Sequence, residues 1–197
     1  MSTEYPPLIN EIVQKLDTRQ PLPPLAPEKE WDSELTKQIQ AASIADLFNG
    51  RALKDPSLAN AVKSALLLWN DALDDSHDIS QGVRSKTGSY WHGIMHRREP
   101  DYSNSKYWFA RVGSHPIFPA LRARVLEILK ADSSQSEQLA RYAEAIERND
   151  NWDAPQFIDW CQDAAKHADD EVVQFLQTVQ VEEMKLLLDY SCRNALA

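Results

Sequence analysis

Hydrophobic residues recur at steps of three and four along most of this chain, which is the spacing of one face of an α-helix. The clearest stretch follows Asp55 and Pro56, an acid at a capping position and a proline at the first helical position. Apolar residues then continue in helical register as far as Leu73, and the next position on this stripe is His77. The pattern therefore predicts one long helix with His77 on its buried face, near its C-terminal end.

The same spacing along the rest of the chain predicts roughly eight helices joined by short loops. Asn49-Gly50 and Gly113 stand where helices are expected to end, and Pro100 stops another. No run alternates apolar and polar residues in the way a half-buried strand does. We therefore expect an all-α protein, built as a compact single-domain bundle with a proline-rich N-terminal arm.

Residues 1–28 form the predicted arm, and residues 29–197 form the predicted helical domain. The arm begins with a short amphipathic helix after Pro6-Pro7, and the segment PLPPLAP at residues 21–27 is expected to be stiff and extended. We expect the arm to lie against the helical domain or against a partner subunit. The second arrangement would make the protein a homo-oligomer.

Composition fits a cytoplasmic protein with its own hydrophobic core. A chain of 197 residues can bury such a core without disulfides or structural metals. The two cysteines, Cys161 and Cys192, lie far apart and match no metal-binding or redox spacing, so we expect reduced, packed thiols. No apolar run approaches the roughly 20 residues of a membrane span, and the N-terminus lacks a basic targeting segment.

The net charge of −9 argues against nucleic acid as a partner, but the charges are unevenly distributed. Residues 80–118 hold six cations and two acids, a net charge of +4 that leaves −13 for the rest of the chain. The six cations are Arg84, Lys86, Arg97, Arg98, Lys106 and Arg111. A cationic segment in an acidic protein indicates a site for a small anionic molecule.

Residues 87–115 contain three of the five histidines, and they carry the most specific chemistry of the chain. His92 and His96 are four residues apart on one predicted helix, so they share a face, and Glu99 continues that face three residues later. Imidazole and carboxylate at this spacing form two or three ligands of a metal site. The predicted cofactor is a divalent, zinc-like transition metal.

A complete metal site needs another ligand from a different part of the chain. His77 is the first candidate, because only a short loop separates its helix from that of His92, and His115 is the second. The chain is not a zinc protease of the H-E-x-x-H type, since Gly93 stands where the catalytic Glu would be. The alternative is that the histidines are structural and bond to carboxylates or backbone carbonyls, with no metal cofactor.

Four cations close to the histidines are candidate substrate-binding residues, because guanidinium and ammonium groups suit carboxylate or phosphate. They are Arg97, Arg98, Lys106 and Arg111. The alternative is that each pairs with an Asp or Glu of the protein itself. Six aromatic residues between 90 and 109 are dense enough to line a pocket, although packing in the core is the commoner role of such residues.

The segment TGSYWHGIMHRREPDYSNSKYWFARVGSHP is similar to the signature segment of a family of uncharacterised proteins to which no activity is attached. This resemblance covers about thirty residues and implies no residue roles. The leading hypothesis is a metal-dependent enzyme acting on a small anionic substrate, with its catalytic residues unknown. The alternative is a non-enzymatic helical protein that binds an anion or a partner and has structural histidines.

Overall fold

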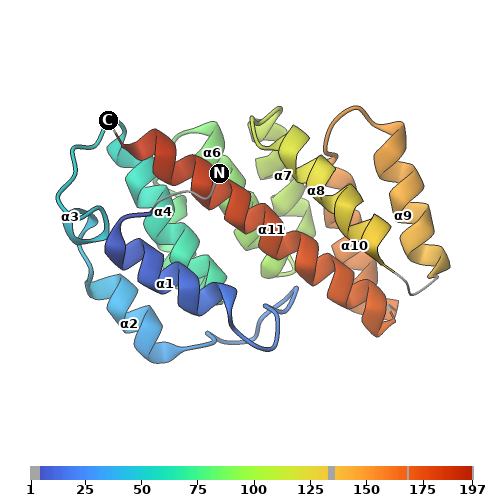
Figure 1. Ribbon diagram of the computed structural model, residues 1–197, viewed down its shortest axis with the longest axis horizontal. Helices are drawn as coiled ribbons and strands as arrows, with labels where there is room; N and C mark the ends of the chain where they lie inside the picture. The colour runs from blue at the N-terminus through green and yellow to red at the C-terminus, as the bar shows by residue number, and fades with distance from the viewer. Residues whose placement is uncertain (1–4, 133–135, 168, 197) are drawn as a thin grey trace.

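The computed structural model describes residues 5–132, 136–167 and 169–196, and within these ranges the protein is all-α. The described chain forms eleven helices, and its one extended pairing is an isolated bridge between Leu53 and Leu196. The longest helix, α11, crosses the whole molecule, with α1 to α4 on one side and α8 to α10 toward the other end (Figure 1). The helices are α1 (Pro7–Asp17), α2 (Ser33–Ala41), α3 (Ile44–Leu47), α4 (Pro56–Trp69), α5 (Leu73–Ser80), α6 (Lys86–Arg98), α7 (Tyr102–Val112), α8 (Phe118–Ala131), α9 (Glu137–Arg148), α10 (Ala154–His167) and α11 (Asp170–Ala195).

The all-α class is as predicted, but the expected number of roughly eight helices was too small. The helix predicted to run from Asp55 to His77 is two helices, because Asp71 adopts a left-handed conformation with φ of 64° between α4 and α5. A second break separates α2 from α3, where Ser43 and Asp46 form a capping box that starts a new helix. The apolar stripe continues from α4 into α5, so the spacing of apolar residues does not reveal the break between these two helices.

The helix ends predicted at Asn49-Gly50 and at Gly113 are confirmed. Asn49 and Gly50 follow α3 with φ values of 52° and 66°, and Gly113 ends α7 with φ of 61°. These left-handed conformations favour Asn and Gly, which is why they mark helix ends in the sequence.

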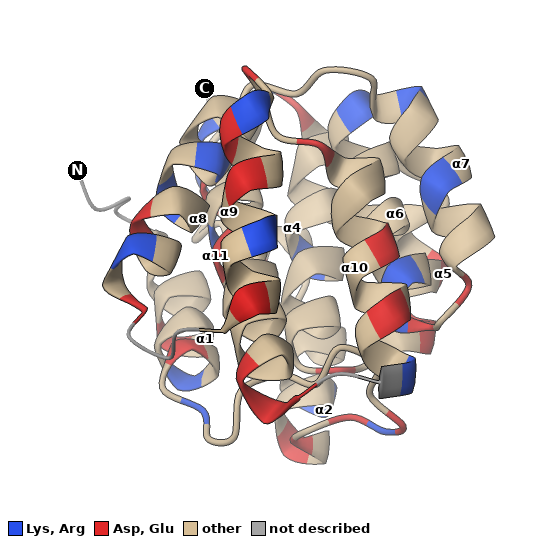
Figure 2. Ribbon diagram, turned by 90° about the vertical axis from the view of Figure 1, so that its right-hand side faces the viewer, with Lys and Arg blue, Asp and Glu red and all other residues tan. Residues whose placement is uncertain are grey.

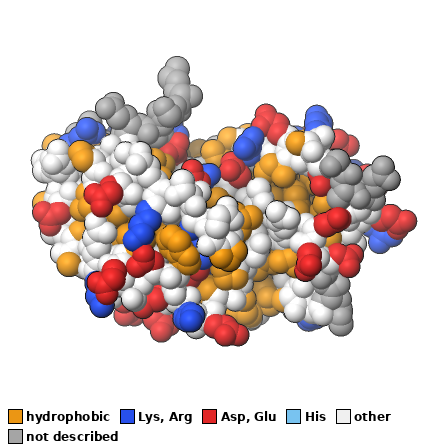
Figure 3. Space-filling model, turned by 60° about the horizontal axis from the view of Figure 1, so that its bottom comes forward, with side chains coloured by type: hydrophobic (Ala, Val, Ile, Leu, Met, Phe, Trp, Pro, Cys, Tyr) orange, Lys and Arg blue, Asp and Glu red, His pale blue; other side chains and the backbone are white. Residues whose placement is uncertain are grey.

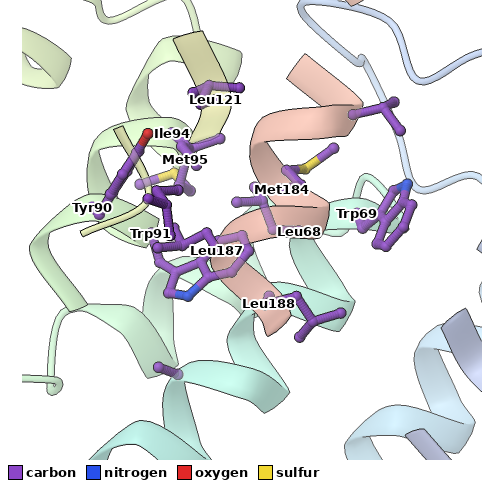
Figure 4. Close-up of a cluster of buried hydrophobic side chains, with 14 of the residues drawn as sticks. Leu68, Trp69, Tyr90, Trp91, Ile94, Met95, Leu121, Met184, Leu187 and Leu188 are labelled. Carbon is purple, nitrogen blue, oxygen red and sulfur yellow. The ribbon is translucent and has the colours of Figure 1, made fainter. Parts of the chain in front are cut away.

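Two helices, α4 and α6, are buried on nearly all sides and form the centre of the molecule. In α6 every residue from Thr87 to Arg98 is buried, since α4, α5 and α7 all pack against it. Figure 4 shows the core where side chains of α4, α6, α8 and α11 meet. They include Leu68, Tyr90, Trp91, Ile94, Met95, Leu121, Met184, Leu187 and Leu188.

From residue 5 onward, the predicted N-terminal arm packs on the rest of the described chain. Helix α1 buries Ile9, Ile12 and Leu16, and it contacts α3 and α4. The segment that follows, residues 18–31, is called the strap below. Within the strap, the carbonyl oxygen of Pro24 accepts hydrogen bonds from side chains of both α6 and α11, each at 3.2 Å. The arm is therefore held by buried polar contacts as well as by apolar packing.

The surface carries mixed charges, and both cysteines are inside. On the face shown in Figure 3, hydrophobic side chains gather across the middle, with acidic and basic ones scattered around them. Cys161 and Cys192 are buried free thiols, as predicted. No helix in the described ranges combines the length and apolar character that a bilayer crossing requires.

Candidate metal centre

Three histidines from two helices converge on one point. His77 comes from α5, and His92 and His96 come from α6. One ring nitrogen from each can be chosen so that all three lie within 4.8 Å of one another. The ring centroids are 4.8 Å (His77 to His92), 5.4 Å (His77 to His96) and 4.6 Å (His92 to His96) apart. This cluster, called the triad below, can hold a metal ion.

A tight antiparallel turn between α5 and α6 creates the triad. It places Ser80 beside His92 and His77 beside His96, so the end of α5 runs along the middle of α6. A Cβ atom on Gly88 would lie 2.1 Å from the carbonyl oxygen of Val83, so no side chain fits at this approach. The glycine thus allows the turn to lie directly on α6 and the two helices to share one site.

Hydrogen bonds orient two rings of the triad. The Oγ of Ser80 lies 3.1 Å from Nδ1 of His92, and the Oε2 of Glu99 lies 3.0 Å from Nδ1 of His96. A metal-binding histidine commonly bonds its second nitrogen to a hydroxyl, carboxylate or carbonyl group in this way. Nε2 of His92 and of His96 is then the nitrogen available for a metal. The amide of Asn104 lies 3.1 Å from Nε2 of His96, so metal binding must displace this contact.

The electrostatic environment keeps two of the rings neutral. Burial, with smaller contributions from the neighbouring His96 and His77, lowers the pKa of His92 to about 4. Burial also lowers the pKa of His96, although its hydrogen bond to Glu99 and the charge of that carboxylate act in the opposite direction. A metal binds the neutral imidazole. At neutral pH the ion therefore need not compete with protons for these two rings.

The triad fits a divalent transition metal in its chemistry and nearly in its spacing. Zn–N bonds of about 2.0–2.1 Å in a tetrahedral site place ligand nitrogens roughly 3.4 Å apart. The observed limit of 4.8 Å therefore requires a closing movement of about 1–1.5 Å, which side-chain rotation can supply. The rings are inclined to one another by 50–70°, so they surround a point instead of stacking. Three protein ligands leave a fourth position open, as in catalytic zinc sites.

The other two predicted ligands lie outside the triad. Glu99 contacts the far side of the His96 ring, and its side chain is 52% exposed. His115 lies against the opposite face of α6, where Thr87 Oγ1 is 3.2 Å from its Nε2 and Tyr90 packs on its ring. The chain after Gly113 returns over the first turn of α6, which separates His115 from the other histidines.

His115 makes stability depend on pH. Burial, with a smaller contribution from the charge of Lys86, lowers its pKa from 6.5 to about 4, so the native state disfavours its protonated form. In the unfolded chain His115 binds a proton more readily than in the native state. The contribution of neutral His115 to the free energy of unfolding is therefore complete above pH 6.5 and is lost as pH falls toward 4. Urea unfolding at pH 7 and 4.5 is expected to show a smaller loss of stability in His115→Gln than in the parent. An equal loss in both proteins would contradict this.

Two of the four predicted substrate-binding cations are in the core. Arg97 and Arg98 are 1% and 0% exposed, respectively, because α6 is surrounded on all sides. Arg97 binds Glu183 at 2.5 Å, and Arg98 binds Asp71. Both arginines therefore pair with carboxylates of the protein itself, which was the alternative to an anion site.

The other two cations lie on α7. Lys106 forms a partly exposed ion pair with Asp159 of α10 at 2.5 Å. Arg111 is exposed, and its guanidinium carbon lies 5.4 Å from the ring centroid of Trp108. The ring centroid of Trp108 is in turn 4.2 Å from that of His92, so α7 covers one side of the triad.

Several residues around the triad were not predicted from the sequence as site residues. Ser80 lies three residues after His77, so helical spacing places it on the same face and could have identified it. Asn104 was given no role in the site, and Trp108 belongs to the aromatic group for which packing was the commoner role. The contacts of these two with His96 and His92 depend on how α7 packs on α6, and no local pattern reveals that packing.

Comparison with known proteins adds no assignment to this geometry. No family model matches the chain, and searches among curated proteins and solved structures found no match. The arrangement of the residues themselves is therefore what indicates a function.

Proposed function

We propose that the protein is a metal-dependent enzyme that binds one divalent, zinc-like ion through His77, His92 and His96 and acts on a small anionic substrate. The convergence of three imidazoles within 4.8 Å is the observation that supports this proposal most strongly. A bound ion of this type would supply a Lewis acid for a substrate oxygen, or lower the pKa of a water molecule.

The residues around the triad have definable tasks in this proposal. Ser80 and Glu99 hold the His92 and His96 rings with Nε2 directed away from them. Trp108 covers the His92 ring and limits the access of water to it. His77 is only partly buried, so the open side of the site lies next to this residue.

Elemental mass spectrometry of protein purified without an affinity tag or chelator tests the metal site. We expect a near-stoichiometric transition metal in the parent protein and its loss in His92→Ala, because one of the three ligands is removed. His115→Gln is the matched control and should keep its metal, since His115 lies on the opposite face of α6. Metal-free parent protein after dialysis against zinc, or equal metal content in His92→Ala, would contradict the proposal.

An open coordination position separates a catalytic ion from a structural one. Cobalt(II) in place of the native ion gives a visible absorption spectrum that responds to a new ligand. Titration with imidazole, which is neutral, should change this spectrum if the fourth position is free. A cobalt-loaded protein whose spectrum does not respond would have a closed site and no metal-dependent catalysis.

A second function is supported by the hydrogen bonds of the triad. Ser80, Glu99 and Asn104 provide contacts for His92 and His96 without any metal. The histidines would then be structural, and the protein would be a non-enzymatic helical protein that binds an anion or a partner. In that case His92→Ala should have a lower melting temperature than the parent protein, and neither protein should contain metal.

A further inference from the structure

One stripe of residues on α7 runs from the triad to the cation Arg111. Asn104, Trp108 and Arg111 follow one another at steps of four and three residues, so they form one stripe along the helix. Asn104 contacts His96, and Trp108 packs on His92. Arg111 continues the stripe with its guanidinium group over the Trp108 ring. Trp108 is therefore the side chain that contacts both the triad and the arginine.

Arg111 differs from the other three predicted cations because it has no carboxylate partner in the described part of the chain. Among the described residues no Asp or Glu oxygen lies within 4 Å of it, and its recorded contacts are with Tyr107 and Trp108. Both it and Tyr107, which is 55% exposed, face solvent. An arginine held by aromatic rings and free of carboxylates is available to a bound anion.

The surrounding charges favour an anion as well. Although the chain contains 30 Asp and Glu residues, segments 79–98 and 102–126 contain none. The ribbon of α7 accordingly shows blue bands and no red (Figure 2). Imidazole is neutral when it binds a metal, so three such ligands would leave the charge of a divalent ion uncompensated. Among the described residues, Glu99 is the carboxylate in contact with a ring of the triad.

We infer that Arg111 and Trp108 form the substrate-recognition half of the metal site, and that the substrate is a small organic carboxylate. Its carboxylate group binds the guanidinium of Arg111 beside Trp108, while a second oxygen group of the same molecule faces the triad. This inference rests on the proposed metal-dependent function and names the substrate class for it.

The local structure favours a carboxylate over a phosphate group. Phosphate is a larger, more highly charged anion, and proteins commonly hold it with free backbone amides at a helix N-terminus. Here the N-terminal amides nearest the site are already capped, since Asp101 accepts from Asn104 in α7 and Ser85 accepts from Gly88 in α6. One planar guanidinium with two parallel donors matches a single carboxylate.

Cobalt-loaded protein provides the test, with succinate, glutarate, acetate and imidazole as probes of the visible spectrum. A dicarboxylate offers one carboxylate to the ion and a second to Arg111, whereas acetate and imidazole offer one group, for the ion alone. We expect Arg111→Gln to weaken dicarboxylate binding by about tenfold or more, the usual effect of losing a charge-assisted hydrogen bond. Imidazole affinity should stay unchanged. Arg148→Gln, an exposed arginine on α9, should bind all probes as the parent does.

The outcomes separate this inference from the function on which it rests. Absence of bound cobalt would overturn both, and absence of an imidazole response would overturn the catalytic role. A normal imidazole response with equal dicarboxylate affinity in Arg111→Gln and parent would overturn the inference alone. Replacing one carboxylate of succinate by a phosphonate tests the class of anion. Tighter, Arg111-dependent binding of the phosphonate would assign the site to phosphate compounds instead.

Discussion

Asp71→Asn is expected to lower the free energy of unfolding by about 3–5 kcal/mol, the usual cost of leaving a buried charge without its partner. The Asp71 carboxylate binds Arg19 at 2.8 Å and also binds Arg98, and all three side chains are 3% exposed or less. Burial outweighs the attraction of Asp71 and lowers the pKa of Arg98, yet an arginine stays protonated in a protein. Both cations would therefore remain charged in the core.

The substitution is clean because asparagine has the same size and tolerates the left-handed conformation of residue 71 as aspartate does. The charge is lost, together with one of the two oxygens that accept from Arg19 and Arg98. Asp159→Asn is the matched control, since Asp159 forms an ion pair whose partners are 41% and 43% exposed, and should cost about 0–1 kcal/mol. Guanidinium chloride unfolding of the two variants measures the difference. Similar losses in both would show that the Asp71 network contributes little.

Glu183→Gln is expected to have a comparable effect, about 3–5 kcal/mol, for the same physical reason. The two oxygens of Glu183 bind the Tyr90 hydroxyl at 2.9 Å and Arg97 at 2.5 Å, in a fully buried position of α11. Burial lowers the pKa of Arg97, but the charge of Glu183 and its hydrogen bond raise it by more. The glutamine amide would face the guanidinium donors, and the cation would have no counter-charge.

Two further variants make this second prediction specific. Glu182→Gln removes the neighbouring carboxylate of the same helix, which pairs with a half-exposed Arg124, and should cost about 0–1 kcal/mol. Adding Arg97→Met to Glu183→Gln removes the unpaired cation, so the double variant should be more stable than Glu183→Gln alone. Urea unfolding measures all three. A double variant less stable than the single one would contradict the assignment of the cost to a buried charge.

The sequence alone was sufficient for the parts of the site that depend on neighbours along the chain. His92 and His96 share a face because they are four residues apart on one helix, and that follows from helical geometry. His77 could be expected beside them because a short loop returns the chain. That expectation did not depend on the predicted number of helices. His77 lies on the separate helix α5 and is still close to His92 and His96.

The parts that depend on tertiary packing could not be obtained in this way. Helix α6 is buried on all sides, so its sequence has no polar face to show where Arg97 and Arg98 point. Their carboxylate partners lie 86 and 27 residues away along the chain, respectively. Composition placed both arginines in a candidate anion site, whereas packing assigns them to ion pairs in the core.

Because of the same two arginines, the three histidines of the triad are not held equally firmly. His92 and His96 belong to a helix that Arg97 and Arg98 tie to α11 and to the strap. His77 belongs to α5, which has only eight residues, and its side chain is partly exposed. If the triad binds a metal as proposed, His92 and His96 would be a fixed chelating pair, and His77 would be the ligand that can withdraw. The residence time of a bound ion, and its exchange with other metals, would then be set by the motion of His77.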